Sequence, residues 1–373
     1  MPPVAHAGAR AVLTIDLAKI AGNYRLLDAR LSGARMGCVV KADAYGLGLA
    51  AIAPVLYAIG CRDYFVADIE EGIALRELLA DGNIFVLNGP IHDSLPAFAE
   101  HRLIPVLNDF GQIALAAARA KSAGESTAAI HIDTGMSRLG LAAGEIEVLA
   151  REPDRLRGIR LACVISHLAC ADQRGNPMNA RQFESFRTAR ALLPKAAASL
   201  ANSAGIFLGP QYHLDLVRTG GALYGLAPME DEPNPLAQVL RLEAPILQVR
   251  DVDSPMTVGY GAGFRVAKRG RIATIPVGYA DGYLRSLSDR GNTFLGGIRV
   301  PVVGRVSMDL ITLDVSGVPE ALARPGALVE LIGEHHSVDE LAHEAGTIGH
   351  DILTEFGRRI ARRYVGSAAA AHS

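Results

Sequence analysis

The sequence predicts an α/β protein: an N-terminal (β/α)8 TIM barrel over residues 13–240 and a C-terminal, mainly antiparallel β domain over residues 241–373. Two patterns predict this fold. Eight apolar, strand-like runs alternate with amphipathic helical segments along roughly the first 240 residues. Beyond Pro235 the runs become β-branched and alternating, and Gly and Pro interrupt them at short intervals. An open doubly wound sheet shares the first pattern, but the number of units favours the closed barrel.

Composition bounds the kind of partner. Half of the 373 residues are hydrophobic, and a net charge of -2 with a pI near 6.6 offers no basic face to nucleic acid or a membrane. We therefore expect a small-molecule partner and no metal site. The four cysteines lie in apolar runs without CxxC pairs, which indicates a reducing compartment. Because neither a signal peptide nor a bilayer-spanning run is apparent, we expect a soluble, cytoplasmic protein.

The first elements follow in order along the chain. Val12 to Ile15 predicts a short strand, and we expect residues 1–12 to join the β domain. Asp16 is placed to cap a helix whose apolar positions recur at helical spacing. The eight barrel strands are predicted at Met36–Lys41, Tyr64–Ala67, Ile84–Asn88, Ile104–Asn108, Ala128–Asp133, Ile159–His167, Ser199–Asn202 and Leu214–Arg218. The helices between them include Glu71–Ala80, Gln112–Ala120 and Ala180–Leu193.

The second domain is predicted to contain short strands and a single helix. That helix begins at the capping box Ser337-Val338-Asp339-Glu340. The strands are predicted at Ile246–Val252, Arg271–Val277, Gly297–Val303, Ile311–Val315 and Leu328–Ile332.

One lysine stands at the end of the first barrel strand. Lys41 follows Val39 and Val40, and Gly46 and Gly48 punctuate the loop beyond it. An amine at the end of an apolar strand is partly desolvated, which lowers its pKa and frees it to attack a carbonyl. A lysine that merely reaches the surface from a strand end would give the same local pattern.

Polar residues follow several other predicted strands at the end where such barrels carry their active sites. Ser203, Gly220 and Gly221 follow the last two strands, where phosphate is often bound. A lysine facing a phosphate site suggests pyridoxal phosphate, with Lys41 as its Schiff-base amine. The other polar residues at these ends are Tyr45, Arg138, His167, Asn202 and Arg218.

Each of these residues also has an ordinary structural explanation. His167 could be a core histidine with satisfied hydrogen bonds, and Arg218 could pair with Asp215 at the surface. Their joint placement at the ends of several predicted strands favours a site.

The chain resembles the alanine racemases along almost its whole length. The stretch Val40-Lys41-Ala42-Asp43-Ala44-Tyr45-Gly46-Leu47-Gly48 looks like their pyridoxal-phosphate attachment signature. The similarity continues in order through Asp133-Thr134-Gly135-Met136-Ser137-Arg138-Leu139-Gly140, His167, Asn202-Ser203-Ala204, Val217-Arg218-Thr219-Gly220, Leu223-Tyr224-Gly225, Gly259-Tyr260-Gly261, Pro276-Val277-Gly278-Tyr279-Ala280-Asp281-Gly282 and Gly304-Arg305-Val306-Ser307-Met308-Asp309.

The resemblance implies a pyridoxal-phosphate enzyme that interconverts L- and D-alanine and supplies D-alanine for peptidoglycan. It implies a head-to-tail homodimer with shared active sites, in which Lys41 and Tyr260 of the partner subunit are the two bases. The remaining implied contacts with the cofactor are Tyr45, Ser203, Gly220 and Gly221 around its phosphate, His167 and Arg218 at its ring, and Asn202. The implied substrate contacts are Arg138 and, from the partner subunit, Met308 and Asp309.

This chain departs from the family pattern at one position near the site. His131 stands where many members carry a lysine modified to a carbamate. A carbamate is an anion that can hold Arg138, whereas a histidine is neutral or positive. Three other functions stay open: a racemase of other specificity, for example for serine, a related amino-acid decarboxylase, and a protein that carries the cofactor without turnover.

Overall fold

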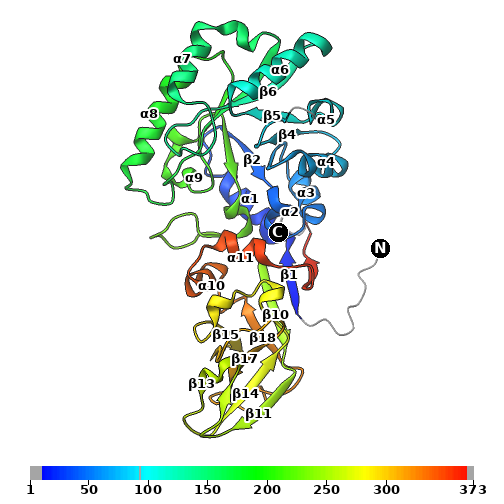
Figure 1. The fold of residues 1–373 in the computed structure, drawn as a ribbon, viewed down its shortest axis with the longest axis vertical. Coiled ribbons are helices and arrows are strands. Elements are labelled where there is room, and N and C mark those ends of the chain that lie inside the picture. Colours follow the sequence, from blue (N-terminus) through cyan, green and yellow to red (C-terminus); the bar gives the residue numbers. More distant parts are fainter. Residues whose placement is uncertain (1–10, 92–93, 368–373) are drawn as a thin grey trace. The chain divides into compact units, whose positions relative to one another are not determined.

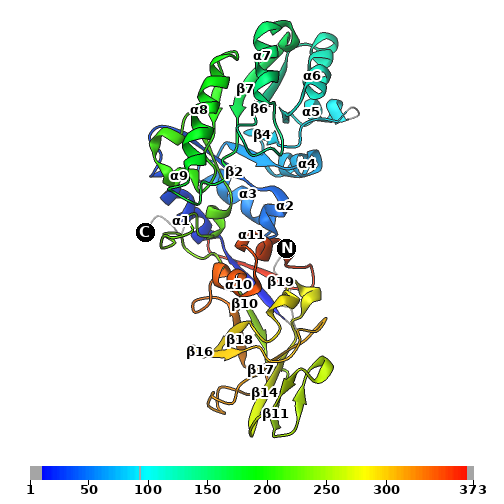
Figure 2. The ribbon, with the colours of Figure 1, turned by 60° about the vertical axis from the view of Figure 1, so that its left-hand side comes forward.

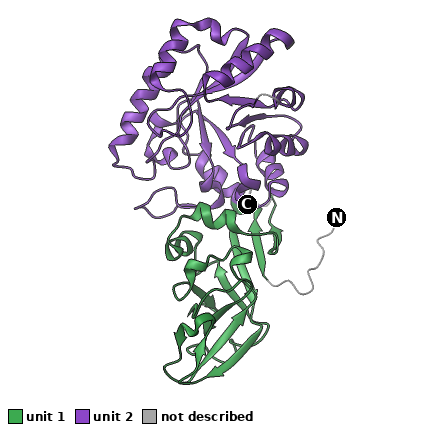
Figure 3. Cartoon of the chain, viewed as in Figure 1, with its two compact units in different colours: residues 1–19, 238–370 green, residues 20–237, 371–373 purple. Residues whose placement is uncertain are grey.

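The computed structural model describes residues 11–91 and 94–367, which form two compact units. One unit comprises residues 20–237, and the other comprises residues 11–19 together with 238–367 (Figure 3). In the residues described, no helix is long and apolar enough to cross a bilayer.

The unit of residues 20–237 is built on an eight-stranded parallel sheet in the order β8-β7-β6-β5-β4-β3-β2-β9. Its strands are β2 (Arg35–Val39), β3 (Asp63–Val66), β4 (Asn83–Val86), β5 (Ile104–Leu107), β6 (Ser126–His131), β7 (Ile159–Ile165), β8 (Ala197–Ser199) and β9 (Leu216–Thr219). The predicted (β/α)8 barrel is confirmed.

The ring of strands has one seam, between β8 and β9, where no strand ladder forms. Two main-chain hydrogen bonds cross the seam. The Asp215 N–H donates to the Ala198 carbonyl at 3.1 Å, and the Arg218 N–H donates to the Ala201 carbonyl at 2.9 Å. The barrel therefore closes through isolated bonds at this point.

Helices surround the barrel strands (Figures 1 and 2). Side chains cap several of them: Asp68 Oδ1 accepts from the Glu71 N–H at 3.0 Å, and Asp109 Oδ1 accepts from the Gln112 N–H at 2.8 Å. The helices are α1 (Leu17–Asp28), α3 (Leu49–Ala58), α4 (Ile69–Leu78), α5 (Leu95–Glu100), α6 (Phe110–Ala123), α7 (Ala143–Arg151), α8 (Pro177–Ala191) and α9 (Gly205–Leu208).

Aromatic packing between the first strands of the barrel depends on one glycine. Phe65 on β3 and Phe85 on β4 stack with their ring centroids 4.7 Å apart. A Cβ at Gly37 on β2 would come within 2.6 Å of the Phe65 ring. The absence of a side chain at Gly37 therefore lets this ring pack against β2.

The other unit contains a six-stranded sheet, a three-stranded sheet and a two-stranded ribbon. The first strand of the chain lies inside the six-stranded sheet, where it pairs antiparallel with β10 and parallel with β19. The strands are β1 (Val12–Asp16), β10 (Leu240–Pro245), β11 (Gln248–Val252), β12 (Thr257–Val258), β13 (Phe264–Arg265), β14 (Gly270–Ile275), β15 (Asn292–Leu295), β16 (Ile298–Pro301), β17 (Ile311–Asp314), β18 (Leu328–Ile332) and β19 (Ala361–Val365).

The prediction of a single helix in this unit was wrong. The capping box at Ser337 does start α10 (Val338–Ala345), with Ser337 Oγ accepting from the Glu340 N–H at 3.1 Å. A second helix, α11 (Gly349–Glu355), follows without a side-chain cap, so it lacked the signal that revealed α10.

Candidate active site

Lys41 lies two residues beyond the end of β2 and begins a left-handed turn, α2 (Lys41–Tyr45). The four residues from Ala42 to Tyr45 all have positive φ angles, between 53° and 57°. Such a conformation costs about 1–2 kcal/mol for each residue that is not glycine. Gly46 and Gly48 also have positive φ angles, 76° and 104°, but the turn already begins at Ala42, directly after the lysine.

A carboxylate on α4 holds this turn in place. Glu71 accepts the Ala42 N–H at 2.5 Å through Oε1 and the Ala67 N–H at 2.8 Å through Oε2. Ala67 follows β3, so Glu71 ties the lysine turn to the end of the neighbouring strand. Inside the turn, the Gly46 N–H donates to the Ala42 carbonyl at 2.7 Å.

The Lys41 amine is tuned toward its neutral form. Burial lowers its pKa, the nearby Arg138 guanidinium lowers it further, and the Glu71 carboxylate opposes both effects. A lowered pKa increases the fraction of neutral amine, which is the form that attacks a carbonyl and accepts a proton.

Replacing Glu71 with glutamine should lower the Lys41 pKa further, because the only opposing negative charge is removed. The amide NH2 would also face one of the two N–H donors, and we expect about 1–3 kcal/mol of lost stability. The pH dependence of Lys41 acetylation in the cofactor-free protein, followed by mass spectrometry, measures the pKa. Glu70→Gln is the control, since Glu70 is exposed on the same helix. A midpoint that rises in Glu71→Gln would contradict this arrangement.

Arg218 on β9 is buried without a carboxylate partner among the described residues. Its Nη1 donates to the Ser199 carbonyl at 2.9 Å and to the Ser199 hydroxyl at 2.7 Å, and its Nη2 donates to the Ser166 carbonyl at 2.5 Å. Burial lowers its pKa to about 10, so it stays a cation at neutral pH. The alternative surface pair with Asp215 was wrong, because Asp215 pairs with Arg190 at 3.2 Å.

His167 follows β7 and is held as a neutral ring by this arginine. Arg218 Nη2 lies 3.2 Å from His167 Nδ1, which must accept the hydrogen bond because a guanidinium can only donate. Burial and the Arg218 charge lower the His167 pKa to about 3. The proton of the neutral ring is therefore on Nε2.

His131 ends β6 and is also neutral. Its Nδ1 lies 2.8 Å from Asn108 Oδ1, while Asn108 Nδ2 donates to the Leu87 and Val106 carbonyls at 3.0 Å each. The Asn108 oxygen can only accept, so His131 carries its proton on Nδ1. Burial and the charge of Arg218 lower its pKa to about 4. His131 therefore brings no positive charge near Arg138.

These two histidines predict a loss of stability in acid. Their native pKa values lie below the unfolded value of 6.5, so the unfolded chain binds more protons between pH 6.5 and about 4. Their stabilising contribution is complete above pH 6.5 and declines as pH falls, by up to about 1.4 kcal/mol per pH unit for each histidine. His131→Gln keeps a hydrogen-bond donor for Asn108 and removes the titrating group. The melting temperature of this variant should therefore fall less between pH 6.5 and 4.5 than that of the wild type. An equal fall of the melting temperature in both proteins would exclude a neutral His131.

A small cradle forms across the seam from the residues after β8 and β9. The Ser203 hydroxyl accepts the Gly220 N–H at 2.9 Å and the Ala222 N–H at 3.3 Å. A Cβ at Gly220 would collide with the Tyr45 hydroxyl, so the absence of a side chain lets this hydroxyl approach the Gly220 backbone. Tyr45 packs on Tyr224 with ring centroids 4.8 Å apart. The hydroxyls of Ser203 and Tyr45 beside a glycine backbone are suited to a phosphate.

The neighbouring Asn202 has a structural task. Its Oδ1 accepts the Gly205 N–H at 2.9 Å and so shapes the turn into α9. Its Nδ2 amino group remains available toward the cradle.

Arg138 lies on an exposed loop that Asp133 shapes. Asp133 Oδ1 accepts the N–H groups of Gly135, Met136 and Ser137 at 2.9–3.1 Å. The Arg138 charge lowers the pKa values of Lys41 and of both histidines, which places it on the same side of the barrel. The ends of the strands thus bring together the predicted residues Lys41, Tyr45, Arg138, His167, Asn202, Ser203, Arg218, Gly220 and Gly221.

The three site residues predicted in the other unit are exposed. Tyr260 starts the 3-10 turn Tyr260–Ala262 with 72% of its surface accessible, and Met308 is 53% accessible. Asp309 pairs with Arg359 Nη1 at 2.6 Å, and Arg359 Nε also lies 3.1 Å from Asp281.

Glycines bring these three residues onto one loop region. A Cβ at Gly259 would come within 3.2 Å of the Arg305 backbone nitrogen, and one at Gly278 would collide with the Ser307 and Met308 carbonyls. The segment 304–308 therefore lies between the turn that carries Tyr260 and the turn at Tyr279–Asp281.

Three residues that shape the site escaped the sequence analysis: Glu71, Asn108 and Ser199. Each acts on a residue far away in sequence, through the Ala42 N–H, the His131 ring and the Arg218 guanidinium respectively. Asn108 is the last residue of the predicted strand Ile104–Asn108, and that position was a usable signal. No signal in the sequence distinguishes Glu71 from the adjacent Glu70.

Two family models together cover most of the chain. The N-terminal domain of alanine racemase matches residues 15–228, and the C-terminal domain matches residues 239–364. The chain is 49% identical over 361 residues to an alanine racemase of Rhodospirillum rubrum, covering 96% of each chain. It is 46% identical over 363 residues to a catabolic alanine racemase of Agrobacterium fabrum, covering 97% of this chain and 94% of the relative.

Solved structures share the same architecture. An alanine racemase from Bartonella henselae with covalently bound pyridoxal phosphate superposes with a TM-score of 0.93 at 39% identity, over 96% of this chain and all of that one. A biosynthetic alanine racemase from Pseudomonas aeruginosa superposes with a TM-score of 0.89 at 34% identity, over the same shares.

Proposed function

The chain belongs to the alanine racemase family, and on that premise we propose that it interconverts L- and D-alanine with Lys41 and Tyr260 as its two proton-transfer groups. It is a pyridoxal-phosphate-dependent isomerase. The observation that carries the proposal is the desolvated Lys41 amine. Lys41 begins a left-handed turn that Glu71 holds through the Ala42 N–H, and it lies on the side of the barrel that carries the Ser203–Gly220 cradle. The two proposed domains are the barrel, residues 13–240, and the β domain, residues 241–373 with the first strand.

The residues at the strand ends fit this cofactor. The Tyr45 hydroxyl approaches the Gly220 backbone, whose N–H donates to the Ser203 hydroxyl, and these two hydroxyls suit a phosphate. Pyridoxal phosphate, when bound, withdraws electrons and acidifies the Cα–H bond of the substrate. Lys41 would hold it covalently, and its remaining proposed contacts are Tyr45, His167, Asn202, Ser203, Arg218, Gly220 and Gly221.

Arg218 can set the strength of that electron withdrawal. A buried guanidinium can only donate hydrogen bonds, so it cannot take a proton from a ring nitrogen, and its charge disfavours a second proton beside it. Withdrawal is thereby limited, which favours return of the proton to Cα over side reactions.

Racemisation needs a proton donor and acceptor on each face of Cα. The neutral form of Lys41 serves one face, and we assign the other to the partner subunit's Tyr260. Tyr260 and Met308 are exposed large side chains around one loop region, which is suited to being covered by a second copy of the chain. Arg138 would bind the substrate carboxylate, and Met308 and Asp309 of the partner subunit would lie near it.

The family membership does not favour a decarboxylase. Relatives of the chain include a catabolic and a biosynthetic alanine racemase, and both duties use the same chemistry. The role we propose is supply of D-alanine for peptidoglycan in the cytoplasm. The four free cysteines, of which three are buried, are consistent with a reducing compartment.

Proton NMR of the holoenzyme with L-alanine in deuterium oxide, combined with chiral analysis, tests the activity. We expect loss of the Cα–H signal together with formation of D-alanine. Exchange with serine but not alanine would identify a different specificity, and no exchange with any amino acid would overturn the proposed function.

Mixing two inactive variants tests the shared active site. In a mixed dimer of Lys41→Ala and Tyr260→Phe subunits, one of the two sites regains both intact residues. Random assembly after joint refolding should therefore restore about one quarter of the wild-type activity. No recovery, with mixed dimers verified by mass spectrometry, would place both groups on one chain.

A further inference from the structure

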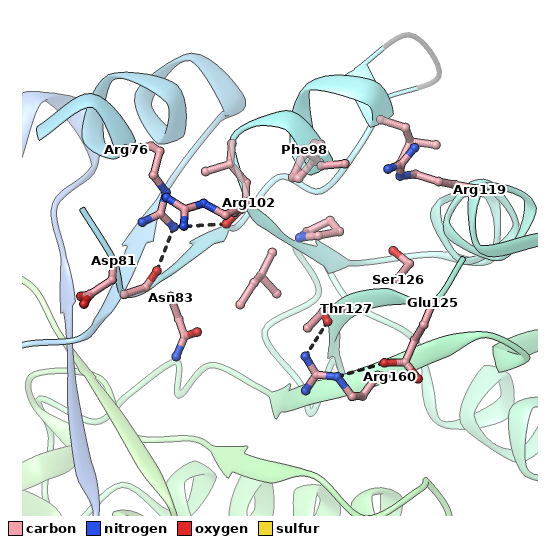
Figure 4. Close-up of a pocket in the computed structure, with 16 residues that line it drawn as sticks. Arg76, Asp81, Asn83, Phe98, Arg102, Arg119, Glu125, Ser126, Thr127 and Arg160 are labelled. Carbon is pink, nitrogen blue, oxygen red and sulfur yellow. Dashed lines mark hydrogen bonds and ion pairs between the residues drawn. The ribbon is translucent and has the colours of Figure 1, made fainter. Parts of the chain in front are cut away.

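A second pocket opens in the barrel unit, at the opposite ends of the strands from Lys41. It lies beside the first residues of β4, β5 and β6, and its volume is about 350 Å³, which is within the range of small-molecule sites. We call it the basal pocket (Figure 4). Its charged lining residues are Arg76, Arg102, Arg119, Arg160, Asp81 and Glu125.

Both carboxylates in the basal pocket already have partners. Glu125 pairs with Arg160 Nε at 3.3 Å. Asp81 accepts from the Tyr57 hydroxyl at 2.9 Å and lies 3.7 Å from Arg62 Nε. The three other arginines of the pocket are left without a carboxylate among the described residues.

Arg76 is fixed with one donor unused. Its Nε donates to the His101 carbonyl at 3.1 Å, and its Nη2 donates to the Gly82 and Arg102 carbonyls at 2.8 and 3.2 Å. Its Nη1 is buried and has no acceptor. Burial and the nearby Arg102 charge lower the Arg76 pKa, so two cations stand close together. An anion beside these two guanidinium groups would screen their repulsion.

Arg119 on α6 completes the charged lining. No hydrogen bond or ion pair reaches its guanidinium from the described part of the chain. In Figure 4, Arg76 and Arg102 lie on one side of the pocket, and Arg119 and Arg160 lie on the other. Cations on both sides suit a ligand with more than one negative charge.

The remaining lining is largely apolar. Phe98 and Leu103 are buried beside the arginines, and Leu95 and Pro105 also line the pocket. Simple inorganic ions would leave this part of the pocket uncovered, so the ligand should also have an apolar portion.

We propose that the basal pocket is a binding site for a small multivalent organic anion, either an organic phosphate or a polycarboxylate. It is separate from the catalytic end of the barrel. The ligand would contact Arg76, Arg102 and Arg119 through its charged groups and Phe98 through its apolar portion.

Titration calorimetry on the holoenzyme, freed of excess cofactor and kept at constant ionic strength, tests this site. The probes are ADP for the phosphate class and citrate for the polycarboxylate class, with adenosine and sodium chloride as controls. We expect saturable one-site binding of at least one probe and of neither control. Arg119→Gln should weaken that binding about tenfold, because it removes a charged partner without removing a contact within the protein.

Arg181→Gln is the matched control, since Arg181 is an exposed arginine on α8 outside the pocket. Binding of ADP alone identifies the phosphate class, and binding of citrate alone identifies the polycarboxylate class. No saturable binding, an unchanged affinity in Arg119→Gln, or binding that displaces the visible absorbance of the cofactor would each overturn the proposal.

Discussion

Replacing Lys41 with alanine is expected to abolish racemisation and the visible absorbance of the covalently held cofactor. The substitution removes the only attachment proposed for the cofactor and one of the two proton-transfer groups. Loss of a general base alone lowers rates by about 10²–10⁴-fold, so we expect a loss of at least about 10³-fold. Absorbance after addition of pyridoxal phosphate and removal of the excess measures attachment, and chiral analysis measures turnover.

Lys19→Ala is the control for Lys41→Ala, because Lys19 is an exposed lysine on α1. It should keep both the spectrum and the activity. A Lys41→Ala protein with the wild-type spectrum would assign attachment to another amine. Circular dichroism should be unchanged in both variants, because the Lys41 side chain forms no hydrogen bond or ion pair with the other residues that the structure describes.

Replacing Tyr260 with phenylalanine is expected to separate proton exchange from racemisation. Racemisation should fall about 10²–10⁴-fold, and equally in both directions, because the equilibrium constant between two enantiomers is one. Exchange of the Cα proton with deuterium should persist for the enantiomer whose proton faces Lys41. It should be lost for the other enantiomer. Proton NMR in deuterium oxide, starting separately from L- and D-alanine, measures both rates.

The matched control for Tyr260→Phe is Tyr57→Phe. Tyr57 loses only its hydroxyl contact with Asp81, at the opposite end of the barrel from Lys41, and should keep both exchange rates. Equal loss of exchange from both enantiomers in Tyr260→Phe would contradict the assignment of one group to each face.

Most of the barrel could be predicted because its strands are apolar runs of the expected length. The fourth predicted barrel strand begins at Ile104, as β5 does. Outside the barrel, the predicted strand Leu328–Ile332 matches β18 at both ends. In the other unit, β10, β12, β13, β15 and β19 were missed. The sequence of β19 is Ala-Arg-Arg-Tyr-Val, and its two adjacent arginines remove the apolar pattern by which a strand is predicted. This strand pairs with β1, at the other end of the sequence. Such pairing depends on tertiary contacts that local pattern does not contain.

The site divides in the same way. Lys41, His167 and Arg218 could be singled out because chemically distinctive residues followed apolar strands. The left-handed turn after Lys41 could not, because alanine does not favour positive φ and the Glu71 carboxylate that holds the turn lies 29 positions from Ala42 in the sequence. The neutral state of His131 likewise depends on Asn108 and on Arg218, which lie 23 and 87 positions away in the sequence.

Arg218 has a consequence for how this enzyme can change over evolutionary time. It joins three adjacent strands, because its own strand β9 lies on one side of the barrel seam and its partners Ser199 and Ser166 lie at the ends of β8 and β7 on the other. An acidic replacement, which would favour a protonated ring nitrogen and a different reaction, would place a carboxylate against the carbonyl oxygens of both serines. It would leave the main-chain hydrogen bonds across the seam but remove those of the guanidinium, and so weaken the seam. A substitution at Arg218 that changes the reaction therefore also destabilises the barrel. Selection for a stable fold acts against such substitutions.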